Sequence, residues 1–218
     1  MTEFDIGVII DSLPFLWQGL MLSFSLTFLA IIGGIVFGTI LALMRVSGLP
    51  LLSISAAAYT NLLRSVPLIL VIFWFYFLVP LIIGEAIGSY YSALIAFIIF
   101  ESAYYAEIIR AGIHSVDKEQ TSAAKASGLN YWQIQRFVVL PQAFRNMIPI
   151  LLTQAIILFQ DTSLVFVVSL RDFMTTASIV AKTEGRLVEM YTFAALVYFI
   201  ICFAGSLCVR RLQKRITV

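Results

Sequence analysis

Hydrophobic residues gather in five long blocks along this chain, and shorter polar segments separate them. The blocks are continuous apolar runs, without the alternation over roughly ten residues that marks a membrane-spanning β-strand. Each block offers the roughly 20 residues that an α-helix needs to cross a bilayer. The pattern predicts an all-α integral membrane protein, with residues 1–218 forming one transmembrane domain. The five expected transmembrane helices cover residues 17–44, 56–83, 90–109, 148–170 and 190–209.

The composition agrees with this pattern. Of the 218 residues, 61% are hydrophobic and 12% are charged, and the mean hydropathy is +1.00. An ordinary soluble domain has about 25% charged residues, so that class is excluded. Residues 1–16 contain no Lys or Arg, whereas a cleaved secretory signal begins with a positively charged segment. The first block is therefore expected to stay in the protein as a transmembrane helix.

Basic residues predict how the chain is oriented in the membrane. Cytoplasmic segments of membrane proteins carry the excess of Lys and Arg. With the N-terminus outside and the C-terminus inside, the inner segments hold eleven basic residues and the outer segments hold three. The net charge of +2 is thus a topology signal and does not indicate binding to nucleic acid. The inner residues are Arg45, Arg64, Arg110, Lys118, Lys125, Arg136, Arg145, Arg210, Arg211, Lys214 and Arg215, and the outer ones are Arg171, Lys182 and Arg186.

No catalytic or metal-binding motif is present in the sequence. Cys202 and Cys208 are six residues apart, which places them about 120° apart on one helix, so they cannot bridge within it. His114 is the single histidine and cannot form a three-ligand metal site by itself. A Gly-x4-Gly-Lys-Ser/Thr loop is absent, and so are His-Glu-x-x-His and Gly-x-Ser-x-Gly. We expect no catalytic residue, no metal site and no cofactor on this chain.

The polar segment over residues 110–146 is predicted to form two short helices joined at Gly128. Asp117 can cap the first helix, and Asn130 can cap the second with Gln133 three residues later. Glycine most easily adopts the left-handed conformation that ends a helix, so Gly128 is expected there. Pro141 is expected to push Leu140 out of the α region, so that the chain turns before the fourth span.

Several ionisable and polar residues lie inside the predicted spans, where each is a functional candidate. Glu101 lies near the middle of the third span, with Tyr104 and Tyr105 expected on its face. Glu107 and Arg110 are three residues apart near the inner end and are expected to pair.

The fourth span carries a polar stripe at helical spacing, formed by Thr153, Gln154, Ile157, Gln160 and Asp161 and extended by Thr162 and Ser163. This stripe suits either a translocation path for a zwitterion or hydrogen bonds to a neighbouring helix. Arg64 is the one basic residue near span depth; it either attracts a carboxylate or extends to the inner interface.

A known motif accounts for the polar segment. Its pattern is Ser122-Ala123-Ala124-x3-Gly128-x9-Val138-x-Leu140-Pro141. It resembles the cytoplasmic coupling loop of ATP-binding-cassette (ABC) importer permeases, which is Glu-Ala-Ala-x3-Gly-x9-Ile-x-Leu-Pro. Ser122 and Val138 depart from that pattern while the spacing is kept. Further segments resemble the polar-amino-acid branch of this family; they begin at Leu13, Arg64, Ala103, Leu140 and Gln160.

The resemblance implies a type I, MetI-like importer permease in the bacterial cytoplasmic (inner) membrane. It implies that a separate pair of ATP-binding subunits binds ATP and Mg. It further implies a second permease subunit, identical or homologous, and an extracellular or periplasmic amino-acid-binding protein, with membrane lipid around the spans. The residues implied to contact the ATPase are Glu119, Ser122, Ala123, Ala124, Gly128, Leu140 and Pro141. The residues expected along the substrate path are Arg64, Glu101, Tyr104, Gln154, Gln160, Asp161, Thr162 and Ser163.

The substrate implied by the resemblance is a polar amino acid. The outer segment from Asp172 to Met190 looks most similar to glutamate/aspartate permease subunits, while glutamine, arginine and cystine stay open. Two other classes of function also stay open at this point. One is an ion-coupled carrier that works without ATP, and the other is a membrane enzyme that acts on lipid.

Overall fold

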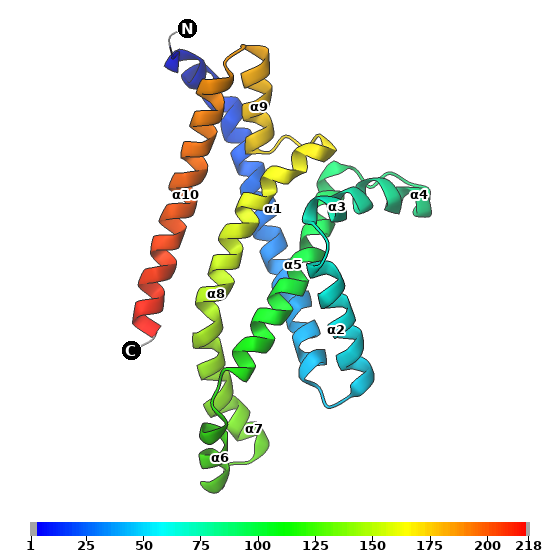
Figure 1. Ribbon diagram of the computed structural model, residues 1–218, viewed down its shortest axis with the longest axis vertical. Coiled ribbons are helices and arrows are strands. Elements are labelled where there is room, and N and C mark those ends of the chain that lie inside the picture. Colours follow the sequence, from blue (N-terminus) through cyan, green and yellow to red (C-terminus); the bar gives the residue numbers. More distant parts are fainter. Residues whose placement is uncertain (1–3, 217–218) are drawn as a thin grey trace.

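The computed structural model describes residues 4–216, which form helices and the turns that connect them (Figure 1). The N-terminus and α9 lie at one end of the molecule, α6 lies at the other end, and the C-terminus lies in the half that contains α6 (Figure 1). The α-helices are α1 (Ile6–Val46), α2 (Pro50–Arg64), α3 (Leu68–Phe73), α4 (Val79–Ile83), α5 (Ser89–His114), α6 (Lys118–Ala126), α7 (Tyr131–Ile134), α8 (Leu140–Asp161), α9 (Phe173–Thr183) and α10 (Leu187–Ile216). Two π-helical turns cover Trp74–Leu78 and Gln135–Val139, and a 3-10 helix covers Thr162–Val168.

Four uninterrupted helical segments are long and apolar enough to cross a membrane: Ile6–Val46, Ser89–His114, Tyr131–Val168 and Leu187–Arg215. A fifth crossing is possible where Pro50–Arg64 and Leu68–Ile83 follow one another, but these two segments meet at an angle of 103°. The all-α membrane class is confirmed. The positions of the membrane boundaries within the helices stay a prediction.

The bend after α2 lies inside the block expected as one straight span over residues 56–83. Ser65 caps the C-terminus of α2, and Pro67 stands at the N-cap of α3 with an extended backbone. Proline has no N–H to donate to the preceding turn and disfavours a helical residue before it, so the helix ends here. The residues at the bend line one side of the cavity described below.

Helices α1 and α5 pack closely along a ridge of small residues. Ala30, Gly34, Gly38 and Ala42 recur every four residues and are all buried. A Cβ added at Gly38 would lie 3.0 Å from the backbone nitrogen of Ala106 and 3.0 Å from a backbone oxygen of α5. Small residues at this spacing let helix backbones approach in a membrane, where van der Waals contact drives association. The α1–α5 contact therefore depends on the small size of the residues along this ridge.

A cluster of charges joins α1, α2 and α5 near the C-terminal end of α5. Glu107 accepts hydrogen bonds from Arg110, which confirms the expected pair, and also from Nη1 of Arg45 at 3.2 Å. The same Nη1 donates to the hydroxyl of Thr60 on α2 at 2.8 Å. One carboxylate thus balances two guanidinium groups from different helices, which stabilises charges close to the apolar core.

Replacing Gly38 with alanine should destabilise the protein, because the new methyl group would press on backbone atoms of α5 that cannot rotate away. Overpacking of this kind costs about 1–3 kcal/mol. The measurement is thermal unfolding in detergent, in which the amount of protein that has not aggregated is recorded at each temperature. The matched control is Gly48→Ala, since no atom lies within 4 Å of a Cβ there. Equal stability of the two variants would contradict the packing role of the ridge.

Candidate functional site

Five of the seven predicted coupling residues lie on α6 and the turn that follows it, and the other two, Leu140 and Pro141, begin α8. Asp117 caps α6 by accepting from the backbone N–H of Glu119 at 3.3 Å, as expected. Ala124 is 8% exposed and packs in the apolar cluster that joins α6 to α5 and α8, together with Val139 and Met147. The side chains that remain exposed on α6 include Glu119, Ser122 and Ala123. The two alanines therefore differ in role: one anchors the helix and the other lies on its free surface.

Gly128 ends this helix in the left-handed conformation, with φ of 84°, as the sequence predicts. Its N–H donates to the carbonyl of Lys125, and the N–H of Leu129 donates to the carbonyl of Ala124. Asn130 then begins α7 with a complete capping box, in which the side chains of Asn130 and Gln133 each accept from the other's backbone N–H. This tight double cap fixes the angle between α6 and α7.

The expected turn at Pro141 is wrong, because the helix continues through it. Leu140 has φ of −59° and ψ of −45°, so it stays in the α region, and one helical segment of 38 residues runs from Tyr131 to Val168. Pro141 is the second residue of α8, which directly follows the wider π-helical turn Gln135–Val139. The side chain of Gln142 donates to the carbonyl of Val138 at 3.0 Å.

A cavity of 510 Å³ lies where the bend after α2 meets α5 and α8. It contains two opposite charges, Arg64 and Asp161, and the polar groups of Tyr104 and Gln154. These four residues come from the predicted substrate path, and tertiary contact brings them together from three separate spans. The remaining lining residues are Ser65, Val66, Pro67, Leu68, Phe100, Ile157 and Leu164.

Glu101 lies behind the cavity wall and holds Gln154 in place. Its side chain is fully buried, and the amide Nε2 of Gln154 donates to both carboxylate oxygens at 3.2 Å. Tyr105 shares the face of Glu101, as expected, because both side chains lie against Gly34 of α1, while Tyr104 points to the cavity. This Glu101–Gln154 contact ties α5 to α8 in the bundle interior.

The two charges of the cavity are held differently. The guanidinium carbon of Arg64 lies 5.5 Å from the centre of the Tyr104 ring, within range of a cation–π interaction. Asp161 is the last residue of α8 and is partly exposed to the cavity. Within residues 4–216, its carboxylate has no hydrogen bond or salt bridge, so it is available to a cationic group. The cavity can therefore hold a molecule that carries both an ammonium and a carboxylate.

Three other residues of the predicted path lie outside this cavity. Gln160 is exposed on another face of α8, and the hydroxyl of Thr162 donates to the carbonyl of Phe159 at 2.7 Å. Ser163 lines a separate cavity of 700 Å³, together with Arg171 and Lys182. No group of three or more potential metal ligands occurs within residues 4–216.

Sequence reasoning missed two features that shape the site. The small residues of α1 were a readable signal, since Ala30, Gly34, Gly38 and Ala42 recur every four positions. The partnership of Arg45 with Glu107 had no local signal, because 62 residues separate them.

Comparison with known proteins identifies the fold and the family. Residues 34–218 match the family described as "Binding-protein-dependent transport system inner membrane component". The glutamate/aspartate import permease protein GltK of Escherichia coli O157:H7 is 48% identical over 222 residues, which cover 99% of each chain.

Two solved structures are similar to this chain. A chain of the crystal structure of an amino acid ABC transporter with histidines has a TM-score of 0.92 at 31% identity, covering 99% of this chain and 100% of that one. A chain of the inward-facing MetNI methionine ABC transporter has a TM-score of 0.73 at 18% identity, with full coverage of both, and shares the fold. With most of its length matched to the family and a relative close to half identical over nearly its whole length, this chain belongs to the inner-membrane permease components of binding-protein-dependent ABC transport systems.

Proposed function

We propose that this chain forms half of the membrane path of an importer for a polar amino acid, with glutamate or aspartate favoured. The observation that carries the proposal is the cavity that brings Arg64 and Asp161 together beside the bend after α2. The similarity to GltK, which is named as a glutamate/aspartate import permease, supports the choice of substrate.

Opposite charges in the cavity suit the two charged groups of an amino acid backbone. Asp161 would accept from the substrate ammonium, and Gln154 and Tyr104 would supply further hydrogen bonds. Arg64 and the N-terminal end of the helical segment Leu68–Ile83 would attract the carboxylate, since a helix N-terminus carries partial positive charge. Discontinuous helices serve transporters in this way near the middle of the bilayer. The side chain of the substrate would extend toward the open side of the cavity.

That open side is one reason to propose a second permease subunit, identical or homologous. The α2–α3 bend, α5, α8 and the 3-10 helix after α8 line the cavity and leave one side open, so a second chain would be needed to close a path around the substrate. A pair of ATP-binding subunits, with ATP and Mg bound to them, would drive the cycle, and a binding protein would deliver the amino acid outside the membrane.

Movement of the ATP-binding subunits would reach the cavity through one continuous helix. We assign the contact with the ATPase to the exposed surface of α6 and the adjoining turn, with Glu119 beside Ser122 compensating for the glutamate that Ser122 replaces. The segment Tyr131–Val168 begins beside α6 and carries Gln154 and Asp161 on its far half. A shift at its base would therefore move one wall of the cavity.

The orientation with the N-terminus outside places α6 on the same side as the ATPase. The half of the molecule that contains α6 also contains the basic C-terminal turn of α10 (Figure 1), in keeping with the excess of basic residues in cytoplasmic segments. In a variant without Cys202 and Cys208, Gln120→Cys should resist a membrane-impermeant maleimide in intact cells, whereas Glu184→Cys should react. Labelling of position 120 in intact cells would reverse the proposed topology.

Gly128→Asp should abolish transport while the protein still inserts into the membrane. An aspartate at φ of 84° costs about 1–2 kcal/mol and changes the angle between α6 and α7. Uptake and membrane abundance are measured together. The control is Gly84→Asp, which has a similar φ of 79° and equally open surroundings but lies far from α6. Normal uptake by the Gly128 variant would remove the coupling role.

Asp161→Asn should raise the KM for transport, because the neutral amide loses the charge that attracts the ammonium. A hydrogen bond to a charged group contributes about 1.5–3 kcal/mol, so the loss corresponds to roughly a 10- to 100-fold change. The assay is uptake of labelled glutamate in cells that carry only this importer, with binding to the isolated binding protein measured separately. The control variant is Gln160→Ala, outside the cavity, which should transport normally.

Competition in the same cells tests the substrate. Unlabelled aspartate should block uptake of labelled glutamate, and glutamine or arginine should not. Competition by glutamine or arginine without competition by aspartate would contradict the acidic substrate. Unchanged uptake by the Asp161 variant would instead mean that the polar stripe of α8 serves helix packing.

A further inference from the structure

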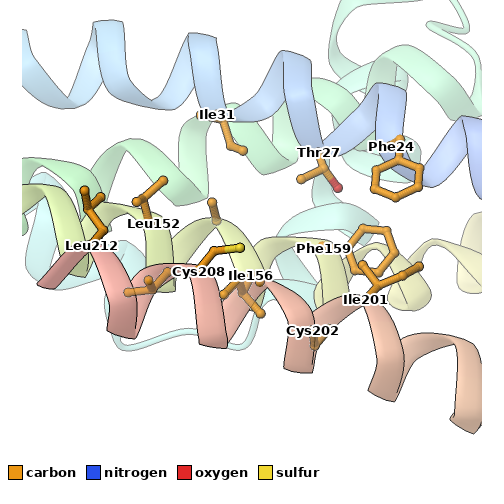
Figure 2. A pocket seen from close by; sticks show the side chains of 13 residues that line it. Phe24, Thr27, Ile31, Leu152, Ile156, Phe159, Ile201, Cys202, Cys208 and Leu212 are labelled. Atoms are coloured by element: carbon orange, nitrogen blue, oxygen red, sulfur yellow. The ribbon is translucent and has the colours of Figure 1, made fainter. Parts of the chain in front are cut away.

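A groove of 380 Å³ runs between α1, α8 and α10, away from the cavity described above (Figure 2). All three helices contribute side chains that point into it, and Figure 2 shows them facing one another across the gap. The lining is formed by Phe24, Thr27, Ile31, Leu152, Ala155, Ile156, Phe159, Ile201, Cys202, Gly205, Cys208, Val209 and Leu212.

The groove is apolar throughout, including at its one hydroxyl residue. Thr27 uses its hydroxyl to donate to the carbonyl of Ser23 at 2.8 Å, which satisfies that polar group within α1. The stacked rings of Phe24 and Phe159, with centroids 5.0 Å apart, close one end. Gly205 adds width, since a Cβ there would lie 3.2 Å from the side chain of Ile156. Nothing in the groove attracts a polar solute.

The length and depth of the groove match one leaflet of a bilayer. From Ile201 to Leu212, α10 rises roughly 16 Å at about 1.5 Å per residue. The hydrocarbon core of a membrane is about 30 Å thick, so one leaflet provides about half of that. The groove begins at the middle of α10 and ends at its basic C-terminal turn.

A basic pocket of 540 Å³ continues the groove at this end. Arg211, Lys214 and Arg215 line it, and it shares Cys208 and Leu212 with the apolar groove. Within residues 4–216, no carboxylate forms a salt bridge with any of these three cations. Three positive charges with no carboxylate partner among the described residues thus lie where the apolar groove ends.

We propose that this groove and pocket together bind one anionic phospholipid of the cytoplasmic leaflet. One acyl chain lies between α8 and α10, and the phosphate contacts Arg211, Lys214 and Arg215. Basic pockets next to transmembrane helices on the cytoplasmic side bind anionic headgroups in this way. A second copy of this chain is a poorer occupant, because two such grooves facing each other would bring like charges together. The bound lipid would fill the space between α10 and the helices that carry the coupling motion.

Native mass spectrometry of the purified importer complex tests this site, with phosphatidylglycerol and phosphatidylethanolamine as probes. The wild-type complex should retain phosphatidylglycerol in preference to phosphatidylethanolamine. Each basic side chain near an anionic surface contributes roughly a fivefold factor, so the triple variant Arg211→Gln, Lys214→Gln, Arg215→Gln should bind it roughly 100-fold more weakly. The matched control is Arg210→Gln, which lies on the same turn but outside the pocket.

A second variant tests the apolar half separately. Cys208→Trp should fill the groove and release the lipid, whereas Leu207→Trp, at the adjacent position outside the lining, should retain it. Equal retention of the two lipids by the wild-type complex would overturn the proposal. So would unchanged retention by both the triple and the Cys208 variants, or a cross-link from Cys208 to the second permease subunit.

Discussion

The close approach of α1 and α5 is the constraint on which the rest of the molecule depends. In a bilayer, lipid tails are as apolar as the helix surfaces, so the hydrophobic effect does not drive helices together. Close packing must therefore provide the attraction between them. The ridge from Ala30 to Ala42 lets the two backbones meet, and α5 is then fixed as the central helix. From that position α5 presents Glu101 to α8 and Tyr104 to the cavity, and Glu107 binds Arg45 near the C-terminal end of α5.

Polar groups in the bundle interior join helices on one side and leave a site on the other. Both carboxylate oxygens of Glu101 accept hydrogen bonds from Gln154, so Glu101 fixes the wall of the cavity. The carboxylate of Asp161, in contrast, lines the cavity. Family membership sets aside the two other classes considered from the sequence, a carrier that works alone and an enzyme that acts on lipid. The broken second span, which such a carrier would also use, here belongs to an importer permease.

The sequence predicts this structure well where the signal is local. The apolar blocks, the caps at Asp117 and Asn130 and the left-handed Gly128 each depend on a few adjacent residues, and the structure contains them. Pro141 was misread because its effect depends on the π-helical turn before it, which has no clear signature. The cavity combines Arg64, Tyr104 and Gln154 from three spans. Their meeting depends on the α2–α3 bend and on helix packing, which composition and spacing do not determine.

The uninterrupted helix from Tyr131 to Val168 also determines how far one of its ends moves when the other end is displaced. It packs closely against α5 at Gly112, where an added Cβ would lie 3.0 Å from Met147, and we take this contact as a pivot. Tyr131 lies about 24 Å below that pivot and Asp161 about 21 Å above it, at roughly 1.5 Å per residue. The arms are nearly equal, so a stiff rod tilting there would displace the cavity wall about as far as its own base. Under the proposed coupling, this helix would therefore not amplify the motion, and the full displacement would have to be supplied at α6.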